Sequence, residues 1–224
     1  MSSNPTSRTN IYGMKIKVAV FVNHPQCSVQ SAHGIVRTLQ DYSIDCIGRQ
    51  HLRDKVLKKY DLLCIPGGLG DSDTWHSIME PFADSITNFV ASGRRYLGIC
   101  MGAYWAGPYY FNLLQNIEPV QYIKRAHAEV RRSFGTVVDI DWSGQTETVY
   151  FYDGCVFIGK GPRQVLATYS NGEPAAIIQD NLGLIGPHLE SDIYWYSKPY
   201  MKPYWHDYRH HDLLKKFVDQ LFAN

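Results

Sequence analysis

The sequence predicts an α/β fold in which a mainly parallel sheet is covered by helices on both faces. Up to Asn116, short apolar stretches rich in β-branched residues alternate with segments of helical spacing, an order typical of parallel sheets. Beyond that point, short strand-like stretches follow one another between Gly, Asn and Asp turns. They predict antiparallel strands added to one end of the sheet. With 224 residues, 45% of them hydrophobic, the chain can bury a large core.

The first half of the chain supplies the parallel part of the expected fold. Lys15 to Asn23 is a β-branched apolar run, typical of a strand buried on both faces. Ser28 to Tyr42 carries apolar residues at helical spacing. The later expected elements are strands at 44–47, 61–65 and 95–99, and helices at 51–59, at 79–91 and from Met101 onward. Gly93 stands where a glycine commonly ends a helix.

The second half supplies the antiparallel strands and a last helix. Strands are expected at 134–142, 148–158, 164–169, 175–179 and 182–185. An amphipathic helix is expected over 212–222, with apolar residues at helical spacing. We therefore expect one domain over 14–224, with 192–224 packed onto it, after a flexible polar tail at 1–13. Met14, directly before the first strand, offers an alternative start.

Composition excludes several classes of protein. Lys plus Arg is 22 and Asp plus Glu is 21, so the net charge of +1 lacks the excess expected for binding nucleic acid or an anionic membrane. The sequence has no apolar run of about 20 residues for a membrane span. Residues 1–10 are polar and lack the apolar core of a signal peptide, so we do not expect secretion. The five cysteines are scattered, which argues against a disulfide framework or zinc ribbon. We expect a cytoplasmic protein, with Cys46, Cys64 and Cys155 in the core.

The strongest local signal is Gly98-Ile99-Cys100-Met101-Gly102, between an expected strand and an expected helix. A nucleophile flanked in this way by two glycines is typical of a nucleophile elbow, a sharp turn that projects one side chain above the sheet. A helix that begins after Cys100 would favour its thiolate form through the helix dipole. The alternative interpretation is a buried structural cysteine.

A candidate base lies near the end of the chain, in Gly186-Pro187-His188-Leu189-Glu190. In extended chain, residues i and i+2 point to the same side. Glu190 can therefore accept a hydrogen bond from the His188 ring nitrogen that faces away from a thiol, as in a catalytic triad. This segment follows the expected strand at 182–185, so it reaches the sheet edge where open α/β folds place their sites.

The loop Pro66-Gly67-Gly68 ends another expected strand and reaches the same edge of the sheet. Backbone N–H groups of Gly67 and Gly68 can form half of an oxyanion hole. The Met101 N–H, directly after the candidate nucleophile, would form the other half.

Together these motifs resemble the class I glutamine amidotransferase-like superfamily, whose members use a Cys-His-Glu triad. More specifically, the chain resembles the N-terminal domain of biotin-protein ligases. The resemblance lies in Pro66-Gly67-Gly68, 98–104, 149–154, 166–169 and 186–190. It implies a flavodoxin-like three-layer α/β/α sandwich, with Cys100 as nucleophile, His188 as base and Glu190 as the acid that orients the base.

Two departures limit what the resemblance implies. Glutaminases of this superfamily usually carry a glutamine four residues after the cysteine, where this chain has Tyr104. This weakens glutamine as the substrate, although biotin-ligase-type domains also tend to have tyrosine there. We expect Tyr104 to shape the substrate pocket. The sequence has no biotin ligase catalytic motif, so biotin transfer is not expected.

The leading hypothesis is a cysteine-dependent hydrolase or amidotransferase-like enzyme acting on an amide or related carbonyl group of a small molecule. It needs no metal or organic cofactor. The alternative is a catalytically silent module of the same fold that binds a ligand or regulates a partner.

The C-terminal segment leaves further interpretations open. Tyrosines and tryptophans over 194–208 are interleaved with Lys and Arg. Packing over the sheet edge, a lid over Cys100 or a contact in a homo-oligomer is favoured over stacking on nucleic acid bases. His206 and His210 are spaced to form a metal pair, but no carboxylate or cysteine completes a clear site.

Overall fold

A nine-stranded sheet forms the middle layer of the computed structural model, which describes residues 8–9 and 13–224. Five strands run parallel to one another, in the order β2 (Ser43–Ile47), β1 (Lys17–Phe21), β3 (Leu62–Ile65), β4 (Arg95–Ile99) and β11 (Leu182–Ile185). Antiparallel strands continue the sheet as β10 (Pro174–Gln179), β9 (Gln164–Tyr169), β6 (Thr136–Trp142) and β7 (Gln145–Phe151). The predicted combination of a parallel sheet with antiparallel strands at one end is confirmed.

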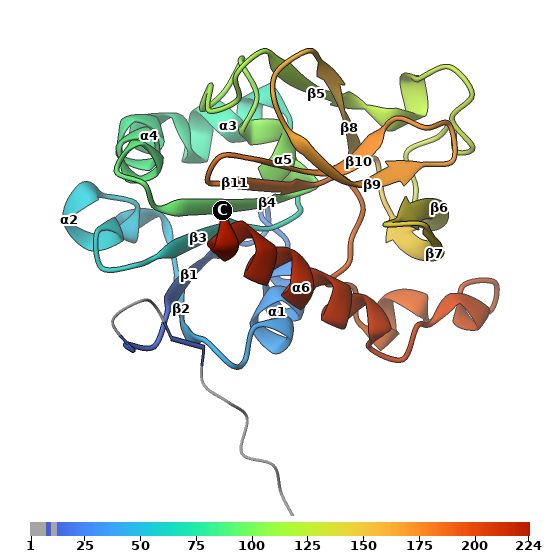
Figure 1. Cartoon of the computed structure of the whole chain (residues 1–224), viewed down its shortest axis with the longest axis horizontal. Coiled ribbons are helices and arrows are strands. Elements are labelled where there is room, and N and C mark those ends of the chain that lie inside the picture. The colour runs from blue at the N-terminus through green and yellow to red at the C-terminus, as the bar shows by residue number, and fades with distance from the viewer. Residues whose placement is uncertain (1–7, 10–12) are drawn as a thin grey trace, which may run out of the picture.

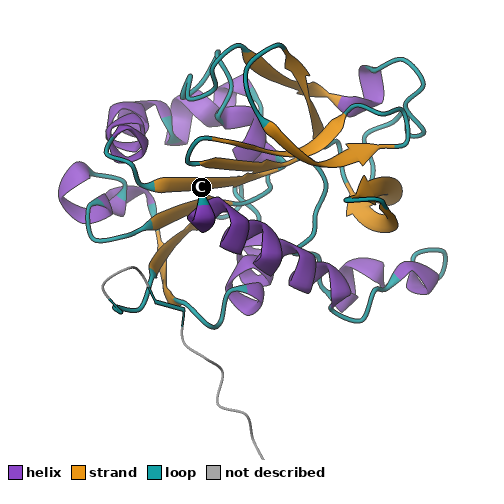
Figure 2. Ribbon diagram, viewed as in Figure 1, coloured by secondary structure: helices purple, strands orange, loops and turns teal. Residues whose placement is uncertain are grey.

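Helices cover both faces of the sheet (Figures 1 and 2). One face carries α1 (Val29–Thr38) and α6 (Arg209–Ala223), and the other carries α2 (Asp54–Leu57), α3 (Ser72–Ile78), α4 (Ala83–Ala91) and α5 (Met101–Trp105). Strand β1 explains this arrangement, because Val18 and Val20 join the core under α1 and α6, whereas Ala19 and Phe21 join the core on the other face. A continuous apolar strand is what burial on both faces requires.

The antiparallel half differs from the prediction at one turn that matters for the site. The stretch 148–158 is two strands rather than one, because β7 ends at Phe151 and β8 (Cys155–Gly159) pairs with β5 (Ile117–Gln121) in a separate two-stranded sheet. Asp153 turns the chain with a φ of 50°. A Cβ on Gly154 would lie 2.4 Å from the Gly186 carbonyl oxygen, so the turn packs closely on the segment before His188.

Several predicted boundaries shift because capping and packing override spacing. The helix predicted over 79–91 begins at Ala83, and the unpredicted α3 precedes it, capped by the Asp71 side chain, which accepts from the Thr74 N–H at 2.7 Å. The helix predicted over 51–59 is reduced to a short 3₁₀ turn followed by α2. Cys64 and Cys155 are buried as expected, whereas Cys46 is exposed on the edge strand β2.

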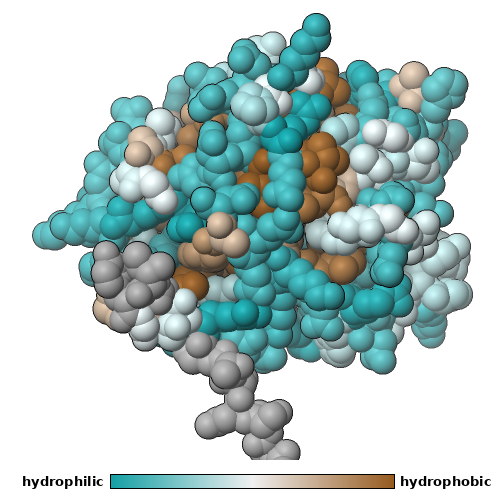
Figure 3. Space-filling view, viewed as in Figure 1, coloured by the Kyte–Doolittle hydropathy of each residue, from teal (hydrophilic) through white to brown (hydrophobic). Residues whose placement is uncertain are grey.

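The predicted tail lies mostly outside the described residues, and its described part is held in place. Thr9 forms a β-bridge with Lys15, and the Arg8 guanidinium lies 2.7 Å from the Asp219 carboxylate. Among the described helices, none has the length and apolar character needed to span a bilayer. On the face shown in Figure 3, hydrophilic side chains cover most of the surface and apolar ones lie in smaller patches.

Candidate active site

The turn between β4 and α5 has the geometry of a nucleophile elbow. Cys100 adopts φ 50° and ψ −104°, a strained conformation for a residue with a side chain. A Cβ on Gly98 would lie 2.5 Å from the Gly102 carbonyl oxygen, and one on Gly102 would lie 2.1 Å from the Ile65 carbonyl oxygen. Both glycines are therefore needed for the turn to close. The Cys100 N–H donates to the Ile185 carbonyl at 2.9 Å, which ties the elbow to β11.

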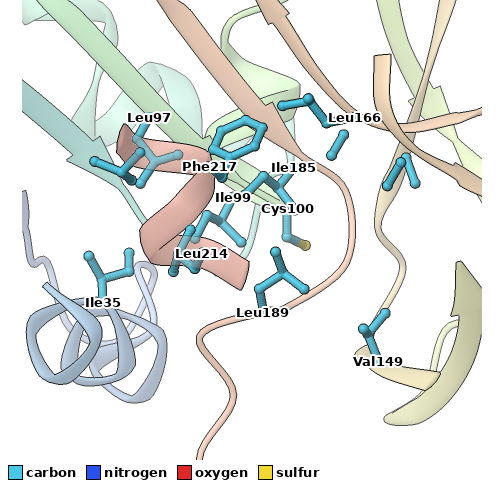
Figure 4. Packing of buried hydrophobic residues seen from close by; sticks show 14 of the residues in the cluster. Ile35, Leu97, Ile99, Cys100, Val149, Leu166, Ile185, Leu189, Leu214 and Phe217 are labelled. Carbon is cyan, nitrogen blue, oxygen red and sulfur yellow. The ribbon is translucent and has the colours of Figure 1, made fainter. Parts of the chain in front are cut away.

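The Cys100 side chain lies at the border between the core and a surface cleft. It is 6% exposed and belongs to the apolar cluster under α6, and Figure 4 shows it beside Ile185 and Leu189. Its Sγ lies 3.6 Å from the Tyr152 carbonyl oxygen, which the turn after β7 brings to the site. Because α5 has five residues, little helix dipole acts on the sulfur, in contrast to the prediction.

His188 and Glu190 form a buried pair, as the spacing predicted. The distance from His188 Nδ1 to Glu190 Oε1 is 2.8 Å, and both side chains are buried. Burial disfavours the charged imidazolium, but the Glu190 carboxylate and the Cys100 side chain favour it through charge and hydrogen bonding. The net effect raises the pKa of His188 to about 10. The structure thus brings all three predicted triad residues together, with a cationic imidazole favoured at neutral pH.

Ser31 on α1 completes this hydrogen-bonded chain, and the sequence analysis missed it. Its hydroxyl donates to Glu190 Oε1 at 2.6 Å and accepts from the Gly67 N–H at 2.9 Å. The second carboxylate oxygen, Oε2, has no partner among the described residues. No motif marks Ser31 in the sequence; the only available signal is a serine on the buried face of an amphipathic helix.

The Pro66-Gly67-Gly68 loop lies against His188, but its two glycines differ in their hydrogen bonds. The Gly67 N–H is donated to Ser31, so the structure does not offer Gly67 as the oxyanion donor that was expected. A Cβ on Gly67 would lie 2.6 Å from His188 Cε1, which explains the glycine. Within the described part of the chain, the N–H groups of Gly68 and Met101 donate to no other group. These two remain as candidate oxyanion donors.

The cleft beside Cys100 has a volume of about 640 Å³. It is lined by His24, Pro25, Gln26, Ser28, Val29, Gln30, Gly67, Gly68, Leu69, Cys100, Tyr150, Tyr152, His188, Tyr194 and Trp195. Tyr104 lies outside this lining, and its hydroxyl instead donates to the Asp153 carbonyl at 3.1 Å. Burial raises the pKa of Tyr104. Its side chain therefore braces the turn beside Cys100, in a different place from the pocket position expected.

Two aromatic side chains contact the base. The ring centroids of Tyr150 and Trp195 lie 5.9 Å and 5.2 Å from that of His188, and 4.9 Å from each other. The backbone N–H of His188 donates to the Tyr150 carbonyl at 2.8 Å. Trp195 comes from the aromatic C-terminal segment, so part of that segment borders the cleft.

The C-terminal histidines form a second buried cluster behind the triad. The His206 and His210 rings stack with centroids 3.9 Å apart, and His211 Nε2 lies 2.9 Å from the Ser191 carbonyl oxygen. Burial lowers the pKa of His206 to about 2 and that of His210 to about 3, so both are neutral near pH 7. The described residues contain no group of three or more His, Cys, Asp or Glu placed to hold a metal ion. The cluster instead supports the residue that follows Glu190.

The first half of the chain matches a known protein family. Residues 17–112 match the family described as biotin-protein ligase, N terminal. The expected family resemblance is confirmed. The matched residues include the Pro66-Gly67-Gly68 loop and Cys100, and they end before His188 and Glu190. No curated protein matches the chain.

Solved structures show the fold of the whole chain. The structure of PurLQS from Thermotoga maritima has a TM-score of 0.65 at 16% identity, covering 93% of this chain and 100% of that one. A glutamine amidotransferase from the same organism has a TM-score of 0.66 at 12% identity, covering 94% and 99%. Gan42B, a GH42 beta-galactosidase from G. stearothermophilus, has a TM-score of 0.58 at 14% identity, covering 93% of this chain and 30% of that one. The chain therefore has a glutamine amidotransferase-like fold, which by itself fixes no activity.

Proposed function

We propose that the protein is a cysteine-dependent hydrolase or amidotransferase that cleaves an amide or related carbonyl group in this cleft. The observation that carries the proposal is the hydrogen-bonded chain from Ser31 through Glu190 to His188, which ends beside Cys100 at the elbow. A buried carboxylate, an oriented imidazole and an adjacent thiol are the parts of a nucleophilic triad.

In the first step, the Cys100 thiolate attacks the carbonyl carbon and forms an S–C bond, while the carbonyl electron pair moves onto oxygen. The N–H groups of Gly68 and Met101 stabilise this oxyanion. When the tetrahedral intermediate collapses, the C–N bond breaks and the His188 imidazolium gives its proton to the leaving amine. The products of this step are a thioester on Cys100, a neutral His188 and a free amine.

In the second step, neutral His188 takes a proton from water, whose oxygen attacks the thioester carbon. Collapse breaks the C–S bond, releases a carboxylic acid and restores the thiolate–imidazolium pair. Glu190 keeps the same ring nitrogen of His188 hydrogen-bonded throughout. We place this reaction on a small molecule in the cytoplasm, without a nucleic acid partner, and its steps use only the protein's own groups and water.

One observation favours the alternative, a catalytically silent binding module. The Cys100 sulfur lies 3.6 Å from the Tyr152 carbonyl oxygen, to which a thiol S–H can donate a hydrogen bond. In such a module the elbow would serve to hold a ligand, and His188 and Glu190 would be a structural ion pair.

An acyl-transfer experiment distinguishes the proposed enzyme from the silent binding module. An activated 4-nitrophenyl ester is mixed with wild-type protein, Cys100→Ala and the exposed-cysteine control Cys46→Ala. The proposed enzyme releases nitrophenol in repeated turnovers and gains an acyl group that mass spectrometry locates at Cys100. Cys46→Ala should behave as wild type and Cys100→Ala should lose both signals. Turnover that survives in Cys100→Ala, or its absence in wild type, would refute the proposal.

A further inference from the structure

From the cleft we infer that the carbonyl substrate is an uncharged amide or ester that carries an aromatic or other apolar group, and is not free glutamine or another amino acid zwitterion. This inference rests on the proposed function, because it takes Cys100 as the nucleophile. It adds the chemical class of the substrate, which neither the family match nor the fold assigns.

The charges around the cleft argue against a zwitterion. Among the described residues that line it there is no Asp, Glu, Lys or Arg. The α-ammonium of a zwitterion would lose water on entering without gaining an anionic counter-ion, which disfavours binding. The aromatic rings could in principle hold a cation, but Trp195 and Tyr150 lie against His188, whose imidazolium form is favoured at neutral pH. A second cation would be repelled there.

The mouth of the cleft carries apolar side chains that the protein leaves in water. Val29 is 46% exposed, Leu69 59%, Tyr152 50% and Tyr194 39%, and all four are lining residues. Exposed apolar groups gathered around a concave site are typical of a surface that binds a ligand. An apolar substituent on the substrate would cover them and release their hydration water.

Trp195 adds an aromatic ring to this apolar wall. Its indole N–H is buried and has no hydrogen-bond partner among the described residues, although the ring lines the cleft. Because this nitrogen is closed to solvent, the part of Trp195 that a substrate can reach is the indole ring, and an aromatic or other apolar group can pack on it.

The test measures alkylation of Cys100 by three chlorinated reagents, each of which forms an S–C bond and releases chloride. They are chloroacetamide, its N-benzyl derivative and the chloroketone analogue of glutamine. Each rate is divided by the rate with glutathione, which cancels the intrinsic reactivity of the reagent. We expect N-benzyl chloroacetamide to exceed chloroacetamide by about tenfold or more in this ratio, as burial of an aromatic ring on an apolar wall implies.

Three variants locate the preference. Trp195→Ala should remove most of the N-benzyl preference, and Trp195→Phe should keep the ring contact and most of the preference. Leu69→Ser should cause a smaller loss of the N-benzyl preference, and it leaves the core intact because Leu69 is exposed. Because each value compares two reagents on the same variant, a change in the reactivity of Cys100 itself cancels.

The outcomes separate the substrate class from the proposed function. If the glutamine chloroketone is preferred, or the N-benzyl reagent gains nothing, the inference is wrong while a reactive Cys100 leaves the proposed function standing. If no reagent labels Cys100 faster than glutathione, both are wrong. A benzyl preference that survives Trp195→Ala and Leu69→Ser unchanged would also overturn the inference, because the apolar wall would not be its source.

Discussion

Removing the Ser31 hydroxyl is expected to destabilise the protein and to loosen the triad at the same time. Both hydrogen bonds of the Glu190 carboxylate fall on Oε1, one from Ser31 at 2.6 Å and one with His188 at 2.8 Å. In Ser31→Ala the buried carboxylate keeps only the second, and the Gly67 N–H loses its acceptor.

The magnitude follows from these two losses. A hydrogen bond to a charged group contributes about 1.5–3 kcal/mol, and a buried N–H left unpaired costs about 1–3 kcal/mol. Partial relaxation of the loop reduces the sum, so we expect the free energy of unfolding to fall by about 3 kcal/mol. The midpoint of urea unfolding, followed by circular dichroism, measures this change. Labelling of Cys100 by iodoacetamide should slow by about tenfold, because Ser31 no longer fixes the Glu190 carboxylate that orients the His188 ring.

Thr38 provides a matched control on the same helix. It is also buried, but its hydroxyl has no hydrogen-bond partner among the described residues. Thr38→Val should therefore leave the stability unchanged or raise it, and should leave Cys100 labelling as in wild type. The reasoning fails if Ser31→Ala and Thr38→Val have the same unfolding midpoint, or if Ser31→Ala labels at the wild-type rate.

Two further predictions concern pH and the loop. The folded pKa values of His206 and His210, about 2 and about 3, lie below the unfolded value of about 6.5. Their contribution to the free energy of unfolding is full above pH 6.5, and below it falls by up to about 1.4 kcal/mol per pH unit for each histidine. Urea unfolding at several pH values below 6.5 should therefore show that the free energy of unfolding depends less steeply on pH in His206→Gln than in wild type. Gly67→Ala places a Cβ 2.6 Å from His188 Cε1 and should slow Cys100 labelling by at least about tenfold. Gly93→Ala, whose Cβ meets no atom within 4 Å, should cost about 1 kcal/mol in strain and leave labelling intact.

Local patterns carried enough information to predict the class of fold. Val18 to Val22 is apolar at every position because β1 is buried on both faces from Val18 to Phe21, and a pattern of that kind specifies a central strand. The prediction of a single strand over 148–158 was wrong for the opposite reason. The apolar residues of this stretch resume directly after Asp153-Gly154, and their periodicity does not show that β7 and β8 belong to different sheets.

The candidate site also contains residues that the sequence predicts and residues that it does not. Cys100, His188 and Glu190 sit in motifs whose geometry is local, namely a tight turn and an i, i+2 pair, and the structure brings them together. Ser31, Tyr150 and Trp195 meet the triad only through tertiary packing across the fold. No spacing in the sequence encodes these contacts.

The two oxyanion glycines show where local reasoning ends. The sequence marks Gly67 and Gly68 equally, as neighbours in one loop. Only the packing of α1 shows that the Gly67 N–H is occupied by Ser31 while the Gly68 N–H has no acceptor among the described residues. The direction of a backbone N–H depends on the dihedral angles of the folded loop, which residue identity does not fix.

The central claim is that Cys100 is a nucleophile activated by His188, and the pH dependence of iodoacetamide labelling tests it most directly. Labelling is read at each cysteine by peptide mass spectrometry in wild type and His188→Gln. Glutathione is the reference thiol. The exposed Cys46 does not serve this purpose, because partial burial and the nearby Asp45 raise its pKa. The account predicts that Cys100 labels faster than glutathione and stays reactive at lower pH, and that His188→Gln abolishes both effects. Labelling slower than glutathione, with the same pH profile in both proteins, would contradict it.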